Sequence, residues 1–154
     1  MIARRLARPL LASVFVNGGI ETLRNPGPRA ELAEPVTGKI GEPAPLPDDP
    51  DQLVKANAVV QVVGGVLLAV GKLRRLAAVA LAVSLVPTTL AGHRFWEAED
   101  PAEKAQQQTQ FAKNMGLLGG LILAAVDTGG APSLGWRARR AARRARQALP
   151  LSSN

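Results

Sequence analysis

The chain has 154 residues, the size of a single domain, and contains no cysteine. This absence excludes disulfide bonds, thiolate metal sites, iron–sulfur clusters and a cysteine nucleophile. Aromatic residues make up only 3% of a chain that is 47% apolar, so the apolar content is mainly alanine, valine, leucine and glycine, which suits closely packed helices. The net charge of +7 includes six arginines between residues 137 and 146.

Four apolar segments follow one another along the chain, at residues 4–23, 53–71, 73–92 and 111–129. Each is about as long as a helix that crosses a hydrocarbon core of about 30 Å. None shows the polar stripe that a helix on the surface of a soluble protein needs. The runs entirely free of charge are only 12 to 17 residues long, which keeps a soluble helical bundle as the alternative. The first segment also resembles a signal peptide, although Asn17 interrupts it and no Ala-x-Ala cleavage site follows.

The charged residues sort to alternating sides when the four segments are threaded through a membrane with the N-terminus inside. The inner side then carries twelve basic residues and one acid, Asp127, and the outer side carries seven basic residues and eleven acids. The resulting charges of +11 and −4 follow the positive-inside rule. The sequence therefore predicts an all-α fold, an integral membrane antiparallel four-helix bundle over residues 1–130. We expect it in the cytoplasmic (inner) membrane, with both termini cytoplasmic and a basic cytoplasmic tail over residues 131–154.

A proline-rich extracytoplasmic loop, residues 24–52, joins the first two predicted spans. Seven prolines between residues 22 and 52 exclude a single helix. The stretch "RAELAEPV" favours one short helix, and Asp49 or Asp51 is suited to cap the second span. The loop is either a disordered linker or an ordered lid over the outer end of the bundle.

Polar side chains within the spans gather in the half that this topology turns outward. Such groups are costly in a membrane and generally face the interior of a helix bundle. They predict either an interhelical hydrogen-bond network or an outward-facing ligand pocket, with no metal site. Pro87 is expected to kink the third span and open room for a ligand. The predicted pocket residues are His93, Arg94, Lys113 and Asn114 at the rim, with Glu21, Asn57 and Gln61 deeper.

The only histidine, His93, stands in the stretch "TTLAGHRFWEAED", residues 88–100. A single histidine excludes a bis-histidine haem and a multi-histidine metal site, although His93 with Met115 would form an axial pair. At a membrane surface, the imidazole can donate to a quinone carbonyl and exchange its proton. It can equally anchor the end of its helix together with Arg94 and Trp96.

The tail "RARRAARRARQAL" has the pattern of a basic amphipathic helix. Because it follows a predicted span directly, we expect it to bind anionic lipid of the inner leaflet. An RNA-binding tail is the alternative, but a nucleic-acid partner is not expected. The arginines concerned are Arg137, Arg139, Arg140, Arg143, Arg144 and Arg146.

Three stretches of the chain resemble the DoxX family of small four-span bacterial membrane proteins: "ARPLLASVFVNGGIETL", "LVKANAVVQVVGGVLLAVGKLRRLAAVALAVSLVPTTLAGHRFWE" and "QFAKNMGLLGGLILAA". The proline-rich loop and the arginine-rich tail are similar to its actinobacterial branch. The resemblance covers most of residues 4–130, and its most specific part is the His-Arg-Phe-Trp stretch with the later Lys-Asn pair. It implies a membrane subunit of an oxidoreductase complex. The family name derives from a subunit of a thiosulfate:quinone oxidoreductase, and a mycobacterial relative is described in a complex with superoxide dismutase and a thiosulfate sulfurtransferase. The resemblance carries over no catalytic residues.

The sequence and the resemblance together predict the membrane subunit of a redox or thiol-homeostasis complex. A quinone is the candidate ligand, and a redox enzyme such as superoxide dismutase or a sulfurtransferase is the candidate partner, beside the lipid bilayer. Without a cysteine or a cofactor motif the chain would not carry out redox chemistry unaided, so an enzymatic activity of its own stays open. The alternatives are a non-catalytic membrane scaffold that recruits a cytoplasmic partner through the arginine-rich tail, and a small transporter, which the lack of an inverted repeat disfavours.

Overall fold

The computed structural model describes residues 2–32, 49–127, 136 and 139–144. Four long helices account for most of them, and no strand occurs in these ranges. The prediction of an all-α fold is therefore confirmed for the described part of the chain. A short helical segment also follows the first helix, at residues 27–32, and overlaps the beginning of the stretch where a short helix was expected, residues 29–36. The long helices are α1 (Ile2–Arg24), α3 (Pro50–Val70), α4 (Arg74–Gly92) and α5 (Pro101–Val126).

Local sequence signals explain where these helices begin and end. Asp49 caps α3, because its carboxylate accepts a hydrogen bond of 2.9 Å from the backbone N–H of Asp51. Asp100 caps α5 in the same way, accepting at 2.8 Å from the N–H of Glu103. In both helices a proline follows the cap at the first helical position, where its missing N–H costs nothing. Gly71 ends α3 with a left-handed φ of 75°, a conformation that glycine adopts without strain.

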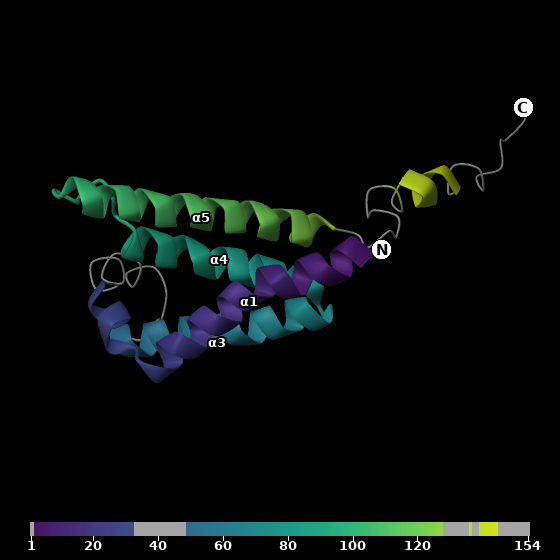
Figure 1. Ribbon diagram of the computed structural model, residues 1–154. Coiled ribbons are helices and arrows are strands. Elements are labelled where there is room, and N and C mark those ends of the chain that lie inside the picture. Colours follow the sequence, from purple (N-terminus) through teal and green to yellow (C-terminus); the bar gives the residue numbers. More distant parts are fainter. Residues whose placement is uncertain (1, 33–48, 128–135, 137–138, 145–154) are drawn as a thin grey trace, which may run out of the picture.

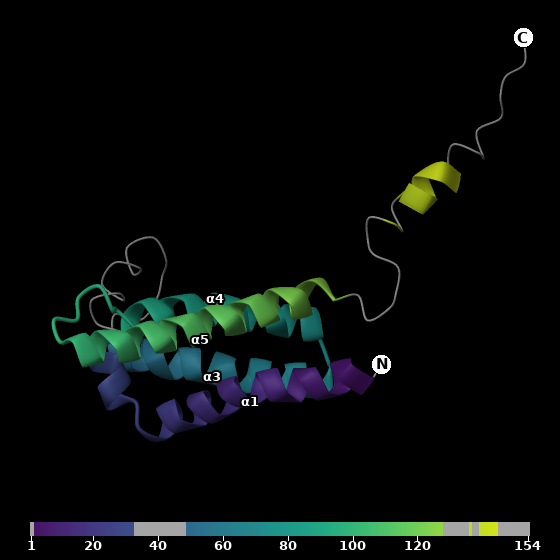
Figure 2. The ribbon, with the colours of Figure 1, turned by 45° about the horizontal axis from the view of Figure 1, so that its top comes forward.

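The four helices run alternately up and down, so each is antiparallel to its neighbour in the chain (Figures 1 and 2). Helix α1 packs along α3, α3 along α4, and α4 along α5, while contact between α1 and α5 is slight. One end of the bundle therefore holds the start of α1, the turn between α3 and α4, and the end of α5. We name it the Asp127 end, and the opposite end the His93 end.

Close packing of α1 against α3 depends on two glycines. A Cβ on Gly19 of α1 would lie 2.7 Å from Val62 Cγ2 and 2.8 Å from the carbonyl oxygen of Ala58. A Cβ on Gly65 of α3 would lie 2.7 Å from Val16 Cγ2. Only a missing side chain lets two backbones approach so closely. Gly116, in contrast, has nothing within 4 Å of an added Cβ, whereas a Cβ on Gly120 would lie 3.4 Å from Leu11 Cδ1 of α1. Of these two glycines, spaced four apart on α5, only Gly120 therefore lies against another described helix.

The interior of the bundle is small, and much of the apolar surface faces outward. The buried core consists of Ala12, Phe15, Leu68, Ala77, Ala78, Leu81, Leu85 and Leu121. Exposed valines and leucines extend along the outer faces of α3 and α4, as at Val63, Val66, Val79 and Val83. These two helices are long and apolar enough to cross a membrane, and most of their residues are not buried inside the protein. A large exposed apolar surface of this kind is typical of contact with lipid.

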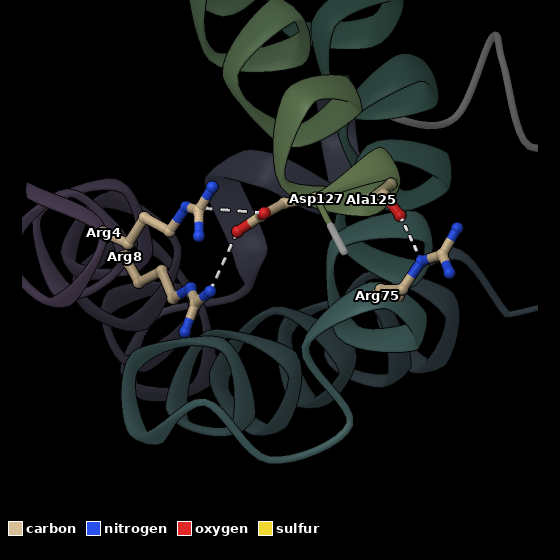
Figure 3. A network of polar contacts seen from close by, with 5 residues as sticks. All are labelled: Arg4, Arg8, Arg75, Ala125 and Asp127. Carbon is tan, nitrogen blue, oxygen red and sulfur yellow. Dashed lines mark hydrogen bonds and ion pairs between the residues drawn. The ribbon is translucent and has the colours of Figure 1, made fainter. Parts of the chain in front are cut away.

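Ion pairs join α1 to α5 at the Asp127 end (Figure 3). The Asp127 carboxylate, just after α5, lies 3.0 Å from the guanidinium of Arg8 and 3.5 Å from that of Arg4. On the other side of α5, Arg75 Nε donates a hydrogen bond of 2.7 Å to the carbonyl oxygen of Ala125. The end of α5 is thereby tied to both α1 and α4, and the single acid predicted for this side of the protein is neutralised by two arginines.

Helix α5 begins ten residues earlier than the apolar segment that the sequence analysis took as the fourth span, at Pro101 instead of Phe111. The added turns, "PAEKAQQQTQ", are polar but rich in good helix formers, and Asp100 caps them. Hydropathy marks where a membrane can be crossed, whereas helix formation depends on propensity and capping, and here the two boundaries differ. The predicted lid residues 33–48 and the tail residues Arg137 and Arg146 lie outside the described part of the chain.

Candidate functional site

A cavity of about 570 Å³ opens at the His93 end of the bundle. All four long helices contribute to its wall, and Arg29 and Leu32 of the short segment after α1 line it as well. Most of the lining is apolar, from residues such as Phe15, Val54 and Leu85. The polar side chains in the wall are few and come from different helices, as is typical of ligand sites: Thr22, Arg29, Asn57, Gln61, Thr88, His93 and Asn114.

Asn57 of α3 and Thr88 of α4 form one cross-helix contact in this wall. Asn57 Nδ2 donates a hydrogen bond of 3.1 Å to Thr88 Oγ1. The Thr88 hydroxyl donates in turn to the carbonyl oxygen of Ser84, one turn earlier, at 2.8 Å. Pro87 lies beside Thr88 in the wall; because it has no N–H, it leaves the carbonyl group of Val83 without its helical donor.

Asn114 of α5 makes the corresponding contact one residue further along α4. Its Nδ2 donates a hydrogen bond of 3.0 Å to Thr89 Oγ1. The Thr89 hydroxyl, which is buried, donates to the carbonyl oxygen of Leu85 at 2.8 Å. Two adjacent threonines thus fix one amide from the helix on each side of α4.

Gln61 of α3 is the polar residue for which the described residues provide no partner. The residue is only 8% exposed, yet its amide makes no hydrogen bond with any described residue. Among these residues, the one fully enclosed side-chain polar atom without a partner is Ser84 Oγ. The amide atoms of Gln61 are therefore not sealed in the protein but open into the cavity that the residue lines. Because this amide has no partner among the described residues and faces the cavity, it is suited to bind what enters there.

His93 ends α4 and lies at the cavity rim. Its backbone N–H caps the helix by donating to the carbonyl oxygen of Thr89 at 3.0 Å. Its ring Nδ1 lies 3.0 Å from Gln107 Oε1, in the part of α5 that the sequence analysis did not recognise as helical. This contact ties the imidazole ring to α5, and the other ring nitrogen, Nε2, makes no hydrogen bond with a described residue.

The structure brings together four of the seven residues predicted for the pocket, namely Asn57, Gln61, His93 and Asn114. The other three lie outside the cavity wall and have partners elsewhere. Arg94 forms an ion pair of 3.0 Å with Glu97, and the exposed Lys113 donates at 3.4 Å to Gln110 one turn earlier. Glu21 is exposed and forms an ion pair of 3.2 Å with Arg29.

Arg29 is the charged cavity residue that the sequence analysis missed. It lies beyond α1, where no spacing rule relates it to the helix face. Its NH1 donates a hydrogen bond of 2.8 Å to the carbonyl oxygen of Gly18, and its NH2 reaches Glu21. Arg29 thus fastens the segment after α1 against the cavity. Thr22 and Thr88 were missed for another reason, because a threonine that bonds to its own helix reads as a packing residue in a sequence.

Aromatic rings cluster just beyond the cavity. Phe95 contacts both Trp96 and Phe111 edge to face, with ring centroids 5.2 and 5.4 Å apart. Trp96 is half exposed. The cluster fastens the turn after His93 to α5, and such aromatic side chains are favoured at the boundary between lipid and water.

Comparison with known proteins places the chain in a protein family but matches it to no individual protein. The family model described as DoxX matches residues 3–94, which include α1, α3 and α4. Neither a curated protein nor a solved structure matches the chain.

Proposed function

Because this chain belongs to the DoxX family, whose model covers more than half of it, we propose that it is the membrane subunit of a redox complex. The family is membrane-associated, and α3 and α4 have the length and composition of membrane spans. The proposal adds that α1 and α5 cross the membrane as well. Charged and amide side chains interrupt the apolar sequences of α1 and α5. Helix α1 nevertheless packs antiparallel along α3, and α5 packs antiparallel along α4.

The proposed orientation turns the Asp127 end to the cytoplasm and the His93 end outward. Basic residues at the Asp127 end support it, since Arg4, Arg5, Lys72, Arg74 and Arg75 all belong to that end. The lack of cysteine makes a direct test simple. In intact cells, a membrane-impermeant maleimide should label the variant Glu99→Cys and leave Lys72→Cys unlabelled, since both positions are exposed in the bundle. The reverse labelling pattern would invert the topology.

We propose that the cavity holds a quinone head group. The observation that carries this proposal is the amide of Gln61, which has no partner among the described residues and lies in an otherwise mostly apolar wall. An apolar cavity with a few polar groups suits a flat head group on an isoprenoid chain. His93 would exchange a proton with the bound ring. Among the described residues, Arg29, and not the predicted Arg94 or Lys113, is the cationic group in the cavity wall.

The electrons would come from a second protein. Reduction of a quinone to a quinol takes two electrons and two protons, and this chain has no cysteine to supply electrons. A redox enzyme such as a superoxide dismutase or a sulfurtransferase is the proposed partner, and the membrane subunit would provide the site where quinone and protons meet.

Purification of the full chain from its native membranes in mild detergent tests this function. Mass spectrometry of the co-purified material should find a stoichiometric redox enzyme and a bound quinone. The variant His93→Ala should retain the partner and its helical circular dichroism, and lose electron transfer to quinone. A folded protein that carries neither partner nor quinone would overturn the proposal.

A non-catalytic scaffold is the second candidate, and the tail supports it. Residues 139–144 are helical, and Arg139, Arg140, Arg143 and Arg144 are all exposed. Arg140 lies over the ring of Trp136, 4.9 Å from its centroid, which steadies this basic segment. A scaffold should lose its cytoplasmic partner when these four arginines are replaced by glutamine and should tolerate His93→Ala. A quinone site should show the opposite dependence.

A further inference from the structure

Three of the four pairs of neighbouring helices are joined directly at the level of the cavity. Helices α1 and α3 meet at Gly19, where an added Cβ would lie 2.8 Å from a carbonyl oxygen of α3. The hydrogen bond from Asn57 to Thr88 joins α3 to α4, and the one from Asn114 to Thr89 joins α4 to α5. These contacts obstruct the passage of a ring-sized ligand between the helices that they join.

The fourth pair, α1 and α5, is joined near the Asp127 end. There Arg8 forms its ion pair with Asp127, and a Cβ on Gly120 would lie 3.4 Å from Leu11 Cδ1. Toward the His93 end, α1 moves away from α5 (Figure 1). In that half, no hydrogen bond or ion pair joins the described residues of the two helices. The side of the cavity that faces the space between α1 and α5 is therefore not bridged.

Cavity residues lie on both edges of this space. They are Val14 and Gly18 on α1, and Asn114 and Leu117 on α5, and we call these four residues the α1–α5 window. Val14 lines the cavity and is also 49% exposed, so it lies at the opening. Gly18 is about two turns after Leu11, on the face of α1 that meets α5. A Cβ added to Gly18 would find nothing within 4 Å, so this edge of the window has free space.

The depth of the window indicates which surroundings it opens to. Val14 lies about 15 Å from the end of α1 at Arg24, at a rise of about 1.5 Å per residue. If α1 crosses the membrane as proposed, this position is near the middle of a hydrocarbon core about 30 Å thick. An opening at that depth faces the hydrocarbon chains of lipids and not water.

We propose that the cavity takes its ligand from the bilayer through the α1–α5 window. The ligand is then a lipid whose hydrocarbon chain lies in the window while its polar head contacts Gln61. The inference rests on the proposed function and refines it, because it names a long-chain quinone and not a water-soluble one. The chain can move from lipid to the window at little cost in free energy, since both are apolar. The polar head gains an amide that hydrocarbon does not offer.

A photoreactive group at the far end of the chain tests this path in the unaltered protein. The probe is decyl-ubiquinone with a diazirine at the end of its decyl chain, added to the full chain in nanodiscs. Mass spectrometry should find adducts within residues 10–18 and 114–118, on both edges of the window. An excess of decyl-ubiquinone without the diazirine should suppress these adducts, whereas adducts on lipid-facing residues elsewhere should persist.

The variant Gly18→Phe tests the same path by filling the window. It leaves in place the Gly18 carbonyl oxygen that accepts from Arg29. We expect it to weaken the binding of decyl-ubiquinone about fivefold or more, because the new ring and the chain would overlap. Gly119→Phe is the matched control, because Gly119 also has nothing within 4 Å of an added Cβ. It lies on the opposite side of α5 from Leu117, so its affinity for decyl-ubiquinone should equal that of the wild type.

The outcomes separate this inference from the proposed function. Suppressible adducts confined to α3, α4 or residues 27–32 would overturn the window and leave the quinone site in place. Equal affinities for decyl-ubiquinone in folded Gly18→Phe and Gly119→Phe would do the same. A folded wild-type protein that neither binds decyl-ubiquinone nor shows suppressible adducts would overturn both proposals. Circular dichroism and the elution volume of each variant verify that it remains folded.

Discussion

Arg8 and Asp127 lie 119 residues apart in the chain and 3.0 Å apart in the structure, where their ion pair joins the start of the bundle to its end. Both side chains are mostly buried, at 18% and 21% exposure. Because α1 and α5 otherwise touch little, this pair holds together two helices at the edges of the fold. Arg4 supports it from a more exposed position, 3.5 Å from the same carboxylate.

We predict that Arg8→Ala lowers the free energy of unfolding by about 1–3 kcal/mol, because it leaves a partly buried carboxylate with a weaker partner. Arg4→Ala should cost less, since that pair is longer and more exposed. Arg5→Ala is the matched control, because Arg5 is exposed in the same turn of α1 and forms no ion pair with a described residue. Thermal unfolding in one detergent gives the comparison, and equal losses for Arg5→Ala and Arg8→Ala would contradict the structural role of the pair.

A second prediction concerns the close approach of α1 and α3. Gly19→Ala should destabilise the bundle by about 1–3 kcal/mol, since overpacking forces backbones apart, and its new methyl group would meet the carbonyl oxygen of Ala58 at 2.8 Å. Gly116→Ala adds the same group where nothing lies within 4 Å, and should be neutral or stabilising because alanine favours a helix. The two variants differ only in position, so similar melting temperatures would refute the close α1–α3 packing.

These contacts show what the sequence could reveal about the fold. The length of the apolar segments and the alternating charge of the loops between them predicted the helical segments, because both properties can be read from short stretches of sequence. The polar start of α5 escaped that method, since Asp100 caps a helix that hydropathy does not detect. The contact between Gln107 and His93 could therefore not be predicted, because Gln107 lies in this overlooked part of α5.

The cavity itself was predictable only where a polar residue interrupts a helical segment. Asn57, Gln61 and Asn114 were found in this way, because an amide in an apolar helix needs a partner. Arg94 and Lys113 were included because they adjoin the site in the sequence, but the structure gives them the neighbours Glu97 and Gln110. Arg29 depends on how the chain turns after α1, which no periodicity encodes.

Gln61 allows a test that separates stability from binding. Gln61→Leu replaces a buried amide that has no partner among the described residues with an apolar side chain of similar size. We expect the melting temperature in detergent to stay the same or rise, while the affinity for a quinol falls about five- to tenfold. Asn57→Leu is the contrasting variant, because it also breaks a cross-helix bond to Thr88 and should lower both properties. A large loss of stability in Gln61→Leu would mean that the amide is a packing group.

His93 gives one pair of ring signals, from Nδ1 and Nε2, when histidine is labelled with ¹⁵N, because the chain has no other histidine. At a pH where the imidazole is neutral, NMR should find the proton on Nδ1, held there by Gln107 Oε1. Gln107→Leu should release the ring to a mixture of both tautomers. A wild-type ring protonated on Nε2 would show that Gln107 turns its NH2 group, and not its oxygen, toward Nδ1.

Photolabelling with an azido derivative of a short-chain quinone tests the central claim most directly. The claim is that a quinone-type ligand occupies the cavity beside Gln61, so mass spectrometry of the labelled full chain should place the adducts within residues 53–61 and 85–93, which line that cavity. An excess of unlabelled quinol and the variant Gln61→Leu should both reduce the labelling. Adducts confined to the exposed valines of α3 and α4, unaffected by quinol or by Gln61→Leu, would show that the quinone only dissolves in the surrounding lipid and would contradict the account.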